Sequence, residues 1–365
     1  MSRSTRCALL ACAAALACAA PAFGVTRPST FSIVAYDSVT QELGVAVESK
    51  YFSVGSVVPW AEAGVGAVAT QSQVNPSYGP QALAMMRSGI APDEILRGFA
   101  VNDSAWNFRQ LGIADAHGRV ASWTGPKCND WAGGITGADF ACQGNILAGE
   151  PVVKGMARAF RQTRGELGER LIAALEAAQA AGGDKRGQQS AALLVVRPSA
   201  HHPEYAQRYV DLRVEDHRTP IAELRRLWRV HQGYHGTAAH MELATEYDAA
   251  GRRDLATRER ERVREIMLAA LTRGERDASM LNGLAWSCAT HDFALDDAVR
   301  VAERAAAIEP KSTDILDTLA ELYFRTNRID RAIAVESRAS ALDPKNQYLK
   351  DQIARFKNGK VAGDR

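Results

Sequence analysis

Hydroxyl, amide and carboxyl side chains are concentrated in one segment of the chain, residues 48–79, together with several glycines. Such groups donate and accept hydrogen bonds and some of them transfer protons, so this segment could bind a polar substrate and assist its reaction. The same composition suits hydrogen bonding in loops and at strand edges, and both interpretations stay open. The polar and aromatic members are Glu48, Ser49, Lys50, Ser53, Ser56, Trp60, Glu62, Thr70, Gln71, Ser72, Asn75 and Tyr78.

Familiar catalytic signatures are absent from the sequence. There is no Gly-x-Ser-x-Gly elbow, no phosphate-binding Gly-x-x-x-x-Gly-Lys loop and no His-Glu-x-x-His zinc motif. Cysteine and histidine residues show no metal-ligand spacing, and His201 and His202 fall in a proline-flanked loop. We therefore expect neither a metal nor another cofactor.

Two cysteines are spaced closely enough to form a disulfide. Cys128 and Cys142 would close a loop of about 15 residues, which could contribute on the order of 3 kcal/mol in an oxidising compartment. Two buried free thiols are the equal alternative. The other four cysteines are Cys7, Cys12, Cys18 and Cys288.

The first 24 residues have the pattern of a secretory signal peptide. Arg3 and Arg6 precede a small apolar run over 7–20, and small residues at 22 and 24 suit a signal peptidase. A lipoprotein modified at Cys18 is the less favoured alternative, because Ala15 stands where such sites prefer leucine. We expect a periplasmic or secreted protein without a membrane span, since no later stretch reaches about 20 apolar residues.

Two structural regions follow the signal peptide. Short apolar runs predict strands, longer Ala- and Leu-rich spacing predicts helices, and together they indicate a layered α+β domain over 30–214. A helix over 152–181 should end at Gly182-Gly183, and the alternating strand 209–214 should lie at a sheet edge. The other predicted strands are 31–36, 43–47, 64–70, 111–114, 119–123 and 191–196, and the other helices are 80–87 and 91–100.

From residue 219 to 357 only helical periodicity remains. The segments 281–310 and 315–344 match at offsets of mostly 34 residues, the tetratricopeptide (TPR) period, so the clearest repeats span 279–346. Stacked helical hairpins commonly hold a protein or peptide ligand, although an extension that only stabilises the first domain is equally compatible. A net charge of +2 gives no reason to expect a nucleic-acid partner.

Several segments together resemble the family called domain of unknown function 1028. They are Thr30-Phe-Ser-Ile-Val-Ala35, Leu43-Gly-Val-Ala-Val47, the stretch from Ser53 through Trp60 to Gln71, Asn75-Pro-Ser-Tyr-Gly79, Gln143-Gly-Asn145 and Gly182-Gly-Asp-Lys-Arg-Gly-Gln-Gln-Ser190. The resemblance covers about Thr30 to Val214. It implies the four-layer αββα sandwich of the N-terminal-nucleophile (Ntn) hydrolases, but not by itself an activity.

The resemblance makes Thr30 a conditional nucleophile. In that superfamily a Thr, Ser or Cys at a new amino terminus attacks with its own α-amine as base. Family members often begin Met-Thr, which exposes the threonine, whereas cleavage after Gly24 leaves residues 25–29 ahead of Thr30. Either a second processing step exposes Thr30, or this chain does not use the mechanism.

Further site residues follow from the matched segments. Asp184 with Arg186 could form a charge pair, or only a solvated turn, and Asn145 could be an oxyanion donor or part of a tight turn. The expected function is an amidohydrolase acting on a small amide or peptide bond, and the alternative is a non-catalytic periplasmic binding or scaffold protein. The catalytic candidates are Thr30, Glu48, Ser49, Asn145, Asp184 and Arg186, and the substrate-binding candidates are Ser53, Trp60, Thr70, Gln71 and Asn75.

Overall fold

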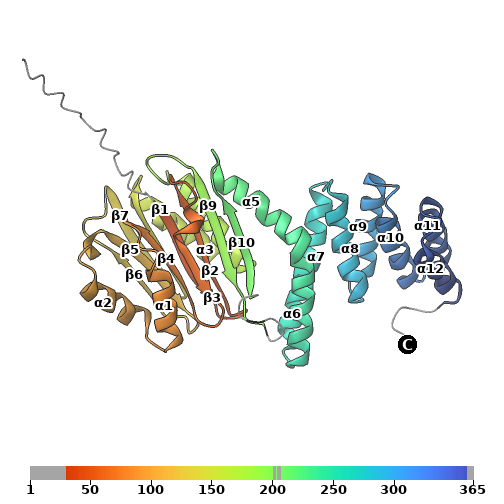
Figure 1. Cartoon of the computed structure of the whole chain (residues 1–365), viewed down its shortest axis with the longest axis horizontal. Helices are drawn as coiled ribbons and strands as arrows, with labels where there is room; N and C mark the ends of the chain where they lie inside the picture. Colours follow the sequence, from red (N-terminus) through yellow and green to blue (C-terminus); the bar gives the residue numbers. More distant parts are fainter. Residues whose placement is uncertain (1–29, 200–202, 204–206, 360–365) are drawn as a thin grey trace, which may run out of the picture.

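The computed structural model describes residues 30–199, 203 and 207–359. A mixed α+β domain with two antiparallel sheets is followed by a region made of helices, which confirms the predicted fold class (Figure 1). The predicted signal peptide, with Cys18, lies outside the described residues, and so do His201 and His202. Within the described part, no helix combines the length and apolar character needed to cross a bilayer.

The first sheet contains six strands in the order β10-β9-β2-β1-β8-β7. Every residue of β1 and β2 is buried, as expected for short β-branched runs covered on both faces. The alternating strand β10 lies at the edge, as its pattern predicts. The strands are β1 (Thr30–Asp37), β2 (Glu42–Ser49), β7 (Trp131–Gly137), β8 (Phe140–Leu147), β9 (Ser190–Val196) and β10 (Arg208–Val214).

The second sheet stacks on the first, and helices cover the outer face of each. Separate apolar clusters fill the space between the sheets and the two spaces beneath the helices, giving four layers in the order αββα. The second sheet, in the order β3-β4-β5-β6, consists of β3 (Pro59–Glu62), β4 (Gly66–Ser72), β5 (Arg109–Asp115) and β6 (Val120–Thr124). It is covered by α1 (Tyr78–Arg87) and α2 (Pro92–Asn102), and the first sheet by α3 (Glu150–Gln162) and α4 (Leu167–Ala180).

Two local expectations were wrong. The helix expected over 152–181 is two helices, α3 and α4, because the chain turns at Gly165, whose φ of +117° suits glycine alone. The alternative of a tight turn at Gln143-Gly-Asn145 also fails, because these residues lie inside β8 and pair with β1. The predicted end of α4 is correct, with positive φ at Gly182 and Gly183.

The helical region runs away from the sandwich as successive hairpins (Figure 1). Fully buried small residues, Ala285 and Ala320 among them, let paired helices approach closely, and one apolar cluster continues from Met241 to Phe356. Its first helix, α5, packs against β9, β10 and α4. The region comprises α5 (Pro220–His231), a π-helical turn (Gln232–Gly236), α6 (Thr237–Ala249), α7 (Arg253–Thr272), α8 (Ala278–Thr290), α9 (Leu295–Ile308), α10 (Thr313–Arg325), α11 (Ile329–Leu342) and α12 (Gln347–Lys357).

Candidate functional site

Thr30 is the first residue of β1, an inner strand of the six-stranded sheet. Its side chain is buried, and its Oγ1 lies 3.1 Å from Oγ of Ser49 on β2. Asn145 on β8 is its register partner on the other side. Because residues opposite one another in antiparallel strands share a face, the three side chains lie together, on the face that meets the second sheet.

A chain of amide groups connects this cluster with the second sheet. Nε2 of Gln71, on β4, donates to the carbonyl oxygen of Thr30 at 3.3 Å and to Oε1 of Gln110 at 2.8 Å. Nδ2 of Asn145 donates to the same Gln110 oxygen at 2.9 Å. Ser32 Oγ donates to Gln71 Oε1 at 2.6 Å. The sheets are therefore joined at the start of β1 by a buried hydrogen-bonded network and not only by apolar contact.

The sequence interpretation assigned no role to Ser32, Gln110 or Gln143. Gln143 donates through Nε2 to Ser32 Oγ at 2.7 Å. Gly112 leaves space for it, since a Cβ there would lie 2.3 Å from Gln143 Oε1. A usable signal was present: Thr30 and Ser32 alternate with apolar residues in a strand predicted to be buried, which places polar groups on one inner face.

Glu48, Asp184 and Arg186 form a separate group. Glu48 is the register partner of Phe31, so it faces the helices α3 and α4 and not the second sheet. Its carboxyl is buried, and burial, followed by the Asp184 carboxylate, raises its pKa well above the usual value despite the opposing effect of the Gln189 backbone N–H. Asp184 accepts from the Lys50 backbone at 2.9 Å and pairs with Arg186 at 3.0 Å. The hydrogen bond from the Lys50 backbone to Asp184 therefore holds the chain in place directly after β2.

The remaining substrate-binding candidates do not meet Thr30. Trp60 packs against α1 at Gly79, on the far side of the second sheet, and Thr70 faces the same side and donates to the Asn75 carbonyl at 3.3 Å. Ser53 begins a short 3-10 turn after β2, where its backbone N–H donates to Glu215 O. Of the five candidates only Gln71 belongs to the Thr30 cluster.

The disulfide alternative is not realised, because Cys128 and Cys142 are free thiols. Cys142 is fully buried in the layer between the first sheet and its helices, whereas Cys128 follows β6 and lies 3.5 Å from the Arg109 carbonyl oxygen. Cys142 therefore lies under the helices of the first sheet, and Cys128 lies in the loop between β6 and β7. Burial raises the pKa of both thiols, so neither is a reactive thiolate at neutral pH.

A buried polar network joins the two regions of the chain. His240 on α6 lies between two carboxylates, with Nδ1 2.6 Å from Glu259 Oε2 and Nε2 3.2 Å from Glu166 Oε1. Burial lowers the pKa of His240, but the carboxylates outweigh it and raise that pKa to about 9. Tyr209 donates to Glu166 Oε2 at 3.1 Å, and Arg197 stacks over the Tyr209 ring. No sequence pattern predicts this network, because its members lie far apart along the chain.

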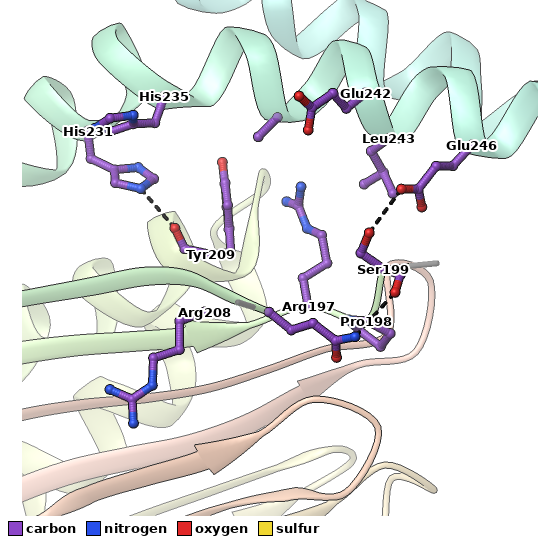
Figure 2. Close-up of a pocket in the computed structure, with 12 residues that line it drawn as sticks. Arg197, Pro198, Ser199, Arg208, Tyr209, His231, His235, Glu242, Leu243 and Glu246 are labelled. Atoms are coloured by element: carbon purple, nitrogen blue, oxygen red, sulfur yellow. Dashed lines mark hydrogen bonds between the residues drawn. The ribbon is translucent and has the colours of Figure 1, made fainter. Parts of the chain in front are cut away.

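Beside this network is a cavity of about 400 Å³. Figure 2 shows Arg197 and Tyr209 rising from the ends of β9 and β10 toward α6, with Glu242 and Glu246 on the opposite wall. Ser199 Oγ donates to Glu246 Oε1 at 3.0 Å across the junction. The cavity offers guanidinium, carboxylate and hydroxyl groups, the mixture found where polar ligands bind at domain interfaces.

Comparison with known proteins gives a family and a fold. The model of the family of unknown function DUF1028 matches residues 30–224, and a tetratricopeptide-repeat model matches residues 289–355. The chain is similar to a crystal structure of protein SPO2555 from Silicibacter pomeroyi, titled as a DUF1028 protein, with 32% identity, a TM-score of 0.51, and coverage of 56% of this chain and 86% of that one. No curated protein matches. Two antiparallel sheets between helices, the family match over the same residues and the solved relative agree: the chain belongs to the DUF1028 family and carries C-terminal tetratricopeptide repeats.

Proposed function

We propose that the protein is an exported amidohydrolase of the N-terminal-nucleophile type, with Thr30 as its nucleophile. The observation that carries this proposal is the position of Thr30 at the start of an inner strand, with its hydroxyl 3.1 Å from Ser49 Oγ and amide donors beside it. The layer order of the sandwich supports it. Export is proposed from the basic and apolar pattern of residues 1–24.

The reaction would use a free α-amine on Thr30. That amine takes the hydroxyl proton as Oγ1 attacks the amide carbon of the substrate, and the developing oxyanion accepts a hydrogen bond from Nδ2 of Asn145. The C–N bond then breaks, the proton passes to the leaving amine, and water hydrolyses the ester to restore the threonine. The amine must first be freed by removal of residues 25–29, because a peptide nitrogen at this position cannot act as a base.

The experiment compares three forms of the mature protein on a panel of aminoacyl 4-nitroanilides. One form begins at Thr30 after methionine removal, one retains residues 25–29, and one begins at Thr30 but carries Thr136→Ala on β7 as a matched control, because Thr136 is exposed and outside the cluster. We expect hydrolysis by the first and third forms only, and its loss in Thr30→Ala. Activity in the form that retains Val25, or an intact native terminus at Val25, would contradict the nucleophile.

The second candidate function is non-catalytic partner binding by the repeats. Large aromatic side chains on two of the repeat helices are exposed, Trp286 on α8 at 42% and Tyr348 on α12 at 50%. Aromatic residues of this kind dominate the energy of protein interfaces. Cross-linking in the periplasm should give products at α8 and α12 that disappear in Trp286→Ala/Tyr348→Ala, and Leu268→Ala on α7 serves as the exposed apolar control.

A further inference from the structure

A second hollow lies at the junction between α4, α5, α7 and α8, with a volume of about 380 Å³. This volume falls within the roughly 300–1,000 Å³ of small-molecule sites and is too small for a folded partner. Much of its lining is apolar and comes from α5, α7 and α8 of the helical region. These residues are Trp228, Ile266, Ala269, Ala270, Met280 and Leu284.

Arginines on the rim outnumber the carboxylates that could neutralise them. Two rim arginines are paired, Arg225 with Glu169 and Glu176, and Arg262 with Glu265. The third lining carboxylate, Glu166, is engaged by His240. The pairing inside the hollow therefore uses all three of its glutamates.

Three further arginines remain: Arg164, before α4; Arg229, in the last turn of α5; and Arg273, at the end of α7. Among the described residues, their side chains have no hydrogen-bond or ion-pair partner. Arg229 and Arg273 both line the hollow. Burial and the Arg229 charge lower the pKa of Arg273, and the Glu275 carboxylate acts in the opposite direction. Two guanidinium groups in one hollow with an apolar floor, to which Ala269 and Leu284 belong, favour an anion that carries an apolar group.

We propose that this hollow binds a small amphiphilic anion, whose aliphatic or aromatic part lies on the floor at Ala269 and Leu284 and whose carboxylate or phosphate head pairs with Arg229 and Arg273. The site is independent of Thr30. The proposed contacts all come from α5, α7 and α8 of the helical region, and Gly165, Glu166 and Glu169 of the first domain also line the hollow.

Isothermal titration of the full chain tests the site with defined probes. Sodium octanoate and octyl phosphate have an octyl-type alkyl tail with a carboxylate or a phosphate head. Octyltrimethylammonium has a similar tail with a positive charge, and acetate has the carboxylate without the tail. We expect octanoate or octyl phosphate to bind at least about tenfold more tightly than the last two probes, and the tighter of them identifies the head group.

Two variants test the two parts of the site separately. Arg229→Gln/Arg273→Gln should weaken binding of the anionic probes about tenfold or more by removing the head contacts, and Ala269→Phe should block it by filling the floor with both arginines in place. Arg276→Gln, an exposed arginine outside the hollow, is the matched control. Circular dichroism must show each variant folded. Unchanged octanoate affinity in the double variant, or equal affinity for octyltrimethylammonium, would overturn the proposal.

Discussion

A threonine hydroxyl held among neutral side chains is a weak nucleophile. Among the described residues, the side chains hydrogen-bonded to Thr30 and Gln71 belong to Ser49, Ser32 and Gln110, and none of them accepts a proton at neutral pH. Glu48, adjacent to Ser49 in the sequence, faces the other side of the sheet. The proposed reaction therefore needs a free α-amine on Thr30 as its base, and the proposal depends on removal of residues 25–29.

The amide network makes a prediction about single residues. Oε1 of Gln110 accepts from both Gln71 and Asn145, so Gln110→Leu removes an acceptor that two buried amide groups share. We expect a loss of about 1–3 kcal/mol in the free energy of unfolding, measured by urea denaturation. Gln162→Leu, at an exposed position of α3, should stay within about 0.5 kcal/mol of the parent protein. Equal losses in the two variants would show that the network contributes no specific stability.

At the scale of elements, the sequence predicts those with strong local patterns. The runs that form β1, β2 and β9 and the repeat helices have clear periodicity, whereas β7, with three glycines in seven residues, has no alternation that would reveal it. The site depends on register and layer order, for example the pairing of Thr30 with Asn145. Spacing along one chain does not contain that information. The family resemblance is what places Ser49 and Asn145 near Thr30, and no sequence feature identifies Gln110 as a member of the same network.

Within the repeats, one buried carboxyl makes α11 sensitive to pH. Glu336 is fully buried, and burial, with the nearby Asp317 carboxylate, raises its pKa to about 8. Glu321 and Arg355, on α10 and α12, also act on it with opposite signs. When folding raises the pKa of a carboxyl, the folded state holds a proton that the unfolded chain has already lost at higher pH. The free energy of unfolding therefore falls as pH rises between the two pKa values.

The expected result is a Glu336→Gln variant that is more stable than the parent protein at alkaline pH. The stability of the parent should fall as pH rises from about 4.5 to about 8, and the variant should lack this fall. Thermal unfolding followed by circular dichroism at pH 4, 6 and 8.5 measures the difference in Tm, with Glu309→Gln as an exposed control. A difference that does not grow across this range would contradict the assignment.

At the scale of the whole molecule, a buried polar network connects the sandwich to the helical region, beside the apolar packing of Ile221, Leu224 and Trp228 of α5 on the first domain. His240 and Glu259 come from the helical region, whereas Glu166, Arg197 and Tyr209 come from the first domain. Buried charges contribute to stability only when each has its partner, so removal of one charge costs more than its own hydrogen bond. The relative position of the two regions should therefore depend on the protonation of His240.

The corresponding prediction concerns His240→Gln. The pKa of His240 is raised from 6.5 to about 9. The contribution of its protonation to the free energy of unfolding is therefore complete below pH 6.5 and is lost as pH rises toward 9. The upper bound of this contribution is about 3 kcal/mol. The variant should melt at a clearly lower temperature than the parent at pH 6 and at nearly the same temperature at pH 9.5, as measured by scanning calorimetry. His291→Gln, at an exposed position after α8, is the control. If the difference in Tm for His240→Gln were the same at both pH values, the charged form of His240 would not be what stabilises the junction.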